Sequence, residues 1–134
     1  MKLKTAEAIQ LYANEITPKI DTAYQGIGYT PKNGEPYQEY YILPAMNEAP
    51  YINQSDIIYR GIFQITLKYP SGNGIREVLE RIDVIEPHFF KGKSIEHSGV
   101  KVVFDDSKTI NLGTDGDRII YAFRVDFRAF KIAV

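Results

Sequence analysis

The chain of 134 residues has no cysteine and no tryptophan, and it has only two histidines. The missing thiols exclude disulfide bonds, thiolate nucleophiles and thiolate metal ligands, and they fit folding in a reducing compartment. No polybasic run is present and the formal net charge is −1, so no sequence-specific nucleic-acid partner is expected. No apolar stretch approaches the length of a membrane span, and the N-terminal lysines are not followed by the apolar segment of a secretory signal. No membrane partner is expected either.

The rest of the composition is that of a soluble globular protein. Hydrophobic residues make up 44% of the chain and charged residues 25%. A chain of this length can bury the core of one domain, which we expect to span residues 1–134. The aromatic content is unusual, with 10 tyrosines and 7 phenylalanines. Most of these are expected on strand faces, although tyrosine is also enriched at protein interfaces.

Residues 5–16 have the periodicity of a helix with one apolar stripe. The stripe consists of Ala6, Ile9, Ala13 and Ile16, which are spaced three and four residues apart. Thr5 is the expected N-cap, and Pro18 is expected to stop the helix shortly after its last turn.

A second and clearer helix is predicted over residues 74–86. Its expected buried stripe consists of Ile75, Val78, Leu79, Ile82 and Ile85. On the exposed side, Arg76 is expected to pair with Glu80 and Glu77 with Arg81, because residues four apart are neighbours on a helix surface. Pro87 is expected to end the helix.

Two segments alternate between apolar and polar residues, as half-buried strands do. They are residues 58–69 and residues 119–130. In the second segment, Arg124, Asp126 and Arg128 lie on the face opposite an apolar series that begins at Ile119. One face of the sheet is therefore expected to contact water or a partner.

Shorter strands complete the predicted sheet. One is expected within residues 20–29, one at 37–43, and two short strands or a hairpin over 94–106 and 108–113. The segments 26–36 and 44–56 are expected to be long loops, a kind of segment that often serves binding. The order of helix, strands, helix, strands predicts an α+β fold, with a mainly antiparallel or mixed sheet packed by two helices.

The stretch Ser71-Gly72-Asn73-Gly74 lies between a predicted strand and a predicted helix, where phosphate-binding loops occur. A P-loop requires a lysine and a following hydroxyl residue, and a dinucleotide-binding turn requires three glycines at fixed spacing. Neither pattern is present. The residues are better explained as a connection, in which Pro70 ends the strand and Asn73 or Gly74 caps the helix.

Other residues with chemical potential also lack the patterns of a site. His88 and His97 have no spacing typical of paired zinc ligands. Asp115-Gly116-Asp117 lacks the further ligands of a calcium loop and is expected to be a hairpin turn, and Asp105-Asp106 forms no recognised motif. We therefore predict no catalytic residue, no metal site and no cofactor.

Four short blocks, taken in order, resemble one protein family. The blocks lie in the three stretches "GYTPKNGEPYQEYYILPA", which holds two of them, "RGIFQITLKYPSGNG" and "IEPHFFKGKSIEHSGVKV", and the resemblance covers roughly residues 26–104. The matching positions are Tyr29, Thr30, Pro31, Pro36, Tyr37, Leu43, Pro44, Ala45, Arg60, Gly61, Phe63, Gln64, Tyr69, Pro70, His88, Phe89, Lys91 and Gly92. In this pattern the chain is similar to the tail terminator, or tail completion, proteins of long-tailed bacteriophages.

The resemblance implies a structural protein with a tail-terminator-like α+β fold. It implies a homo-oligomer that is a hexameric ring in the assembled tail and a monomer in solution, and that caps the tail tube and ends its polymerisation. The implied partners are the major tail tube protein and the head–tail connector proteins. The implied location is the head-proximal end of the virion tail, and the host cytoplasm during assembly. No catalytic residue and no cofactor is implied.

The family resemblance supplies no residue-level binding site, so candidate interface residues come from exposed polar and aromatic positions. They are Tyr29, Pro31, Tyr37, Arg60, Arg124, Asp126 and Arg128. Ordinary solvation of a sheet surface explains the three charged residues of the last strand equally well. Two other functions stay open: another neck component such as a stopper protein, and a small ligand- or phosphate-binding domain that uses the turn at 70–75.

Overall fold

Long strands from three parts of the chain form the centre of a six-stranded sheet. The structure, a computed structural model, describes residues 1–44 and 58–132, so nearly all of the loop expected at 44–56 lies outside the described residues. The elements in chain order are α1 (Lys2–Ala13), β1 (Asp21–Tyr24), β2 (Tyr37–Pro44), β3 (Tyr59–Pro70), the short 3₁₀ helix η2 (Ser71–Asn73), α2 (Arg76–His88), β4 (Ser94–His97), β5 (Val100–Asp115) and β6 (Arg118–Lys131).

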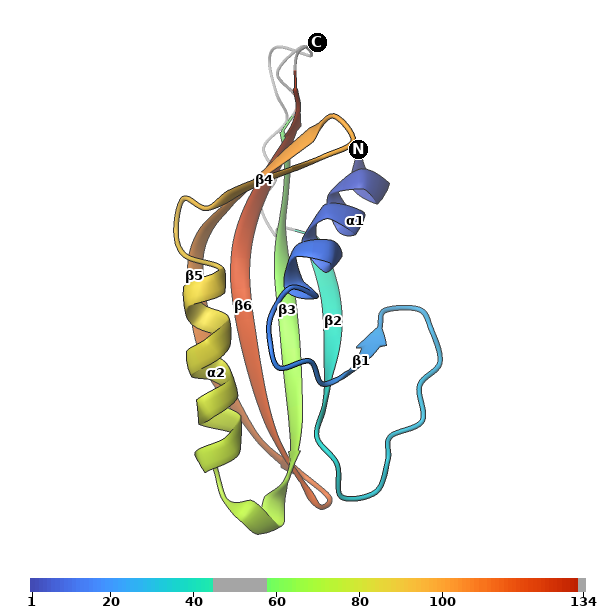
Figure 1. Ribbon diagram of the computed structural model, residues 1–134, viewed down its shortest axis with the longest axis vertical. Helices are drawn as coiled ribbons and strands as arrows, with labels where there is room; N and C mark the ends of the chain where they lie inside the picture. Colours follow the sequence, from blue (N-terminus) through green and yellow to red (C-terminus); the bar gives the residue numbers. More distant parts are fainter. Residues whose placement is uncertain (45–57, 133–134) are drawn as a thin grey trace.

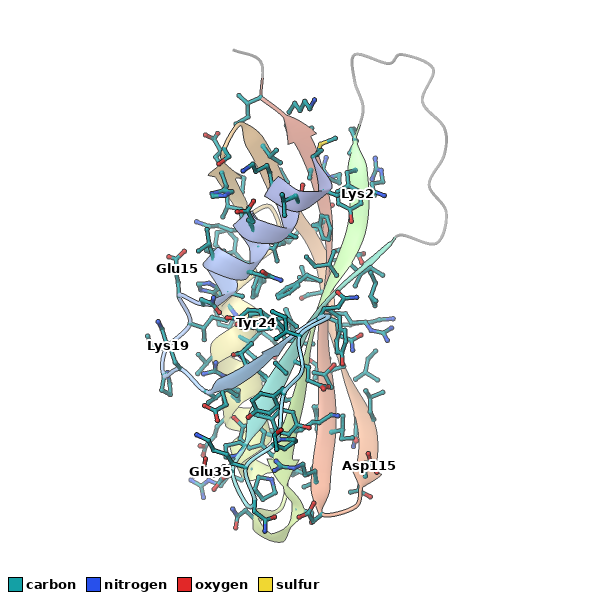
Figure 2. All side chains as sticks on the ribbon, turned by 90° about the vertical axis from the view of Figure 1, so that its right-hand side faces the viewer. Lys2, Glu15, Lys19, Tyr24, Glu35 and Asp115 are labelled. Carbon is teal, nitrogen blue, oxygen red and sulfur yellow. The ribbon has the colours of Figure 1, made fainter. Side chains whose placement is uncertain are left out.

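The strands lie in the order β1-β2-β3-β6-β5-β4. β1 pairs with β2 in parallel, and every other neighbouring pair is antiparallel. Both helices lie on the same face of the sheet, α1 against β4 and β5 and α2 against β3 and β6 (Figure 1). Seen from the side, the helices form one layer and the sheet forms the other (Figure 2). This confirms the expected α+β fold with a mixed sheet.

The core lies between the helix layer and the sheet, as the alternation in the sequence predicted. The large apolar residues buried in the two central strands are Phe63, Ile65, Leu67 and Tyr69 in β3 and Ile119, Tyr121, Phe123, Val125 and Phe127 in β6. Phe89, just after α2, is 1% exposed, and its ring lies 5.0 Å from Phe104 and 5.7 Å from both Phe63 and Phe123. Full burial of one such ring contributes about 1.5–3 kcal/mol to stability.

Helix α1 begins earlier than predicted and ends at Ala13. Thr5 does not cap it: Thr5 is fully buried inside the helix, and its hydroxyl donates to the carbonyl oxygen of Met1 at 2.8 Å. A threonine inside a helix can satisfy its hydroxyl by donating to a carbonyl oxygen of the preceding turn, so its hydroxyl does not have to accept a hydrogen bond at the helix start. Ile9 and Ala13 are buried as expected, and Ile16 is buried in the linker beyond the helix.

The start of α2 also differs from the prediction. Its N-cap is Ile75, which offers no side-chain hydrogen bond, whereas Gly74 has a φ of 69° and belongs to the turn before it. The amide of Asn73 donates to Glu77 at 3.5 Å. The helix extends one residue past Pro87, to His88, so Pro87 lies within the last turn, where it lacks the N–H that would donate to the carbonyl oxygen of Asp83.

The buried stripe of α2 is partly different from the expected one. Val78, Ile82 and Ile85 are buried, whereas Ile75 is 50% exposed and Leu79 is 37% exposed. Arg81 takes a buried place and donates to the carbonyl oxygen of Pro18 instead of pairing with Glu77. The expected pair of Arg76 with Glu80 is present, with Nε 3.0 Å from Oε1.

A single strand, β5, occupies the segment expected to hold two short strands. It pairs with β6 from Val100 to Asp115 through two irregularities, one between Phe104 and Ser107 and one between Asn111 and Gly113. Such bulges let one strand carry an extra residue without ending the pairing. The turn at Asp115-Gly116-Asp117 connects β5 to β6, as expected.

Gly61 is the site of a first prediction. A Cβ atom at this position would lie 2.6 Å from Cζ of Phe127 and 2.9 Å from the carbonyl oxygen of Leu43. Gly61→Ala is expected to lower the free energy of unfolding by about 1–3 kcal/mol, because a buried ring and a backbone atom have to move. Gly72→Ala is the control, since a Cβ there meets no atom within 4 Å. Equal urea midpoints for the two variants would contradict the packing at Gly61.

The buried Tyr40 leads to a second prediction. Burial raises the pKa of its hydroxyl from 10.0 to about 12. In the unfolded chain this group loses its proton near pH 10, whereas in the folded chain it keeps the proton until about pH 12. The free energy of unfolding is therefore expected to fall across that interval, by up to roughly 2 kcal/mol from this group. Urea unfolding at several pH values should show a shallower fall in Tyr40→Phe, and an unchanged slope would contradict the prediction.

Candidate interaction surface

The face of the sheet opposite the helices carries no helix in the part of the chain that the structure describes (Figure 2). Register places its side chains in rows across the strands: Tyr41, Gln64, Arg124 and Lys108 form one row, and Glu39, Thr66, Ala122 and Ile110 form the next. We call this surface the open face. It mixes polar groups with half-buried aliphatic groups, a composition typical of both solvated sheets and protein interfaces.

The charged residues of β6 are held in place on the open face. Arg124 Nε donates to Gln64 Oε1 at 2.7 Å. Arg128 donates to both carboxylate oxygens of Asp105, from Nε at 3.0 Å and from Nη2 at 3.2 Å. A two-point contact of this kind fixes the plane of the guanidinium group. Asp126, between the two arginines in sequence, is exposed.

A second part of the surface is aromatic and lies at the β2 edge. The rings of Tyr29 and Tyr37 are 5.0 Å apart, and the guanidinium of Arg118 lies 4.9 Å from the Tyr37 ring. Pro31 and Tyr41 line the same hollow, which has a volume of about 200 Å³. We call this group the aromatic corner. Figure 2 shows Glu35, in the loop beside it, toward the same end of the molecule as Asp115.

The loop between β1 and β2 is held by polar contacts to Asp21 in β1 and to Arg118 in β6. Arg118 donates to the carbonyl oxygens of Glu35 at 2.6 Å and Lys32 at 2.8 Å. Lys32 Nζ lies 3.4 Å from the Asp21 carboxylate, and the Tyr29 hydroxyl donates to that carboxylate at 3.3 Å. Partial burial and the negative charge of Asp21 raise the pKa of Tyr29. The residues of the aromatic corner therefore have a defined arrangement.

The structure brings all seven candidate interface residues to one side of the sheet, in two groups. Tyr29, Pro31 and Tyr37 meet at the aromatic corner. Arg124, Asp126 and Arg128 lie on the open face, and Arg60 stands opposite Arg128 in the β3–β6 register.

Sequence reasoning missed two features of this surface. One is Arg118, which joins the aromatic corner to β6. The other is the ion pair between Lys68 and Glu39, with Nζ 3.3 Å from Oε1. The alternation of β3 already placed Lys68 on the polar face, but the sequence contains no signal for the strand register that sets it beside Glu39.

The long β5 strand has an outer edge that β4 covers only in part. β4 pairs with residues 100–103, and Phe104 exchanges hydrogen bonds with the backbone of Gly92 and Lys93. Beyond that point the strand is mostly exposed as far as Asp115, including Leu112 at 49%. Bulges and charges along this segment are features that discourage unwanted strand pairing.

The described residues show no arrangement typical of a metal or phosphate site. Among residues 1–44 and 58–132, no group of three or more histidine, aspartate or glutamate side chains is placed to hold a metal ion. The ring of His88 packs against α1 and is stacked on the ring of Tyr12, with 3.9 Å between the ring centroids. His97 Nε2 lies 3.9 Å from the carboxylate oxygen Oε2 of Glu7. At the turn before α2, the first helical turn carries the carboxylate of Glu77, which would repel a phosphate. Within the same described ranges, the helices are too short or too polar to cross a bilayer.

Comparison with known proteins gives the surface its context. No curated protein sequence matches the chain significantly. Three chains of solved structures match, and for one of them the match covers 99% of this chain and 95% of that chain, with a TM-score of 0.74 and 18% sequence identity. At that level of identity the match shows a shared fold. The model of the family described as phage tail terminator protein matches residues 4–126, which include both helices and most of the sheet. The chain therefore belongs to the phage tail terminator protein family.

Proposed function

We propose that this protein forms an oligomeric ring, a hexamer in the assembled tail, that caps the phage tail tube. The ring ends polymerisation of the tube and offers its other side to the head–tail connector proteins. The observation that carries the proposal is the family match over residues 4–126. The proposed location is the head-proximal end of the virion tail, reached after assembly in the host cytoplasm. No catalytic step and no cofactor are part of the proposal.

The composition of the described surface supports a ring. A closed ring of identical subunits needs two different patches on each subunit, which meet in a heterologous contact. We propose that the open face and the adjoining aromatic corner, which lie on one side of the sheet, together supply one of these patches. Tyrosine and arginine are the residue types that most often contribute large binding energies at interfaces.

The paired charges of the open face also suit a surface that is wet before assembly. Arg128 forms an ion pair with Asp105, and Arg124 donates to the neutral amide of Gln64, so both guanidinium groups are held in place within the subunit. Such a face tolerates solvent in a free monomer, and it stays ordered for docking because few side-chain rotamers are left to freeze. The free subunit is therefore proposed to be a monomer that assembles on the tail tube.

A charge reversal on the open face tests the proposal. Asp126→Arg is expected to abolish capping, because a positive charge would be placed among Arg124, Arg128 and the partner surface. Asp83→Arg makes the same chemical change at an exposed position of α2, on the helix side, and is expected to keep capping. Both variants should unfold at nearly the same urea concentration, since surface changes usually stay within about 0.5 kcal/mol.

The measurement is negative-stain microscopy of tail tubes from a host that lacks the natural protein and is supplied with each variant. Capped tubes of uniform length are expected with Asp83→Arg, and tubes of uncontrolled length with Asp126→Arg. Equal capping by both variants would contradict the proposal that the open face is part of the interface. Tubes of normal length without any copy of the protein would overturn tail termination as its function, and capsids that leak DNA beside normal tails would instead indicate a stopper.

A further inference from the structure

A cavity of about 310 Å³ lies on the helix side of the sheet, away from the open face. It forms where the end of α1, the linker to β1, β2 and α2 meet. Figure 2 labels two of its lining residues, Lys19 in the linker and Tyr24 in β1. Its polar lining includes Asn14, Lys19, Asp21, Thr22, Gln38 and Arg81. The volume is at the lower end of the range for small-molecule pockets.

Hydrogen bonds on the β2 side of the cavity fix the orientation of Gln38. Its Nε2 donates to Thr22 Oγ1 at 3.0 Å and to the Tyr40 hydroxyl at 3.1 Å. Each of these hydroxyls has only one proton, and both protons are in use: Thr22 donates to the carbonyl oxygen of Ile20, and Tyr40 donates to Asn14 Oδ1. With the amide in this orientation, Gln38 Oε1 is left buried without a donor.

On the α2 side of the cavity, Arg81 has a buried donor that lacks an acceptor. Its side chain is 5% exposed, Nη1 donates to the carbonyl oxygen of Pro18, and Nε has no partner. Among the described residues, no carboxylate lies within ion-pair distance of this guanidinium. Burial lowers the pKa of Arg81, but a guanidinium remains charged in proteins. A buried cation without an anion is unfavourable, and a ligand that supplies the anion relieves the cost.

We propose that this cavity binds a small α-hydroxy or α-amino carboxylate. The carboxylate accepts from Arg81, and the neighbouring hydroxyl or ammonium group donates to Gln38 Oε1. Arginine is the side chain best suited to a carboxylate, because two parallel N–H groups match its two oxygens. Neither unpaired atom is open to solvent in the present conformation, so binding includes a small movement of the side chains at the cavity wall.

The charge of the lining favours a carboxylate over a phosphate. Arg81 and Lys19 are positive and Asp21 is negative, so the lining has one net positive charge, which balances one carboxylate. Bound ligand would connect α2 to β2 and to the linker before β1. The same Asp21 contacts Lys32 and Tyr29 on its other side, so the cavity and the aromatic corner share one residue. Binding here is separate from the proposed ring, and its failure leaves tail capping untouched.

The first experiment uses the unmodified protein labelled with ¹⁵N. The Arg81 Nε–H resonance is followed while sodium L-lactate, L-alanine or sodium acetate is added, with sodium chloride at equal ionic strength as the control. A saturable shift of this resonance is expected with lactate or alanine, and none with chloride. Tighter binding of lactate would identify a hydroxyl as the group that donates to Gln38, and tighter binding of alanine would identify an ammonium group. Acetate lacks that donor and is expected to bind at least tenfold more weakly. Equal binding of acetate would overturn the role of Gln38, and no shift with any carboxylate would overturn the site.

A thermal-unfolding series with matched variants completes the test. For the natural chain, each tenfold rise in the free concentration of the carboxylate above its Kd is expected to raise the melting temperature by about 3–6 °C. Arg81→Met should abolish this rise, whereas Arg76→Met, the same change at an exposed position of α2, should keep it. A rise that persists in Arg81→Met would contradict the proposal. If that variant does not fold, the NMR titration of the unmodified chain decides alone.

Discussion

The pairing of β3 with β6 is the constraint on which the rest of the structure depends. These strands come from the middle and the end of the chain and pair without interruption from Tyr59 with Ala129 to Pro70 with Arg118. Their shared register places the buried apolar side chains on the helix side and the charged ones on the other, which also carries the half-buried Ile62 and Ile120. A shift of one residue would exchange the two faces, so the core and the open face are specified by the same alternation.

Much of this arrangement is predictable because it is local. The period of two in β3 and β6 predicts both strands and the face that each residue occupies, and Phe123 and Arg124 lie where that period places them. The helix over Arg76–His88 and the hairpin turn at Asp115-Gly116-Asp117 follow from equally local signals. The candidate interface residues of β6 were found for the same reason, since they occupy the polar half of an alternating strand.

What the sequence did not predict depends on contacts between distant segments. Arg81 looked like the partner of Glu77 on an exposed surface, but the linker around Pro18 supplies a carbonyl acceptor that draws it inward. Thr5 looked like a cap, but α1 packs this residue against the sheet side. The aromatic corner needs Arg118, which is 86 residues away from Lys32 in the chain. None of these contacts leaves a periodic trace in the sequence.

The two bulges of β5 have a consequence for how copies of this protein can meet. A strand that offers an unbroken row of backbone donors and acceptors can be extended by another copy, and that copy by the next, without end. Here the row is interrupted after Phe104 and again after Asn111, so the geometry repeats too poorly to be continued. This edge therefore offers no regular template along which a fibre of strand-paired copies could grow.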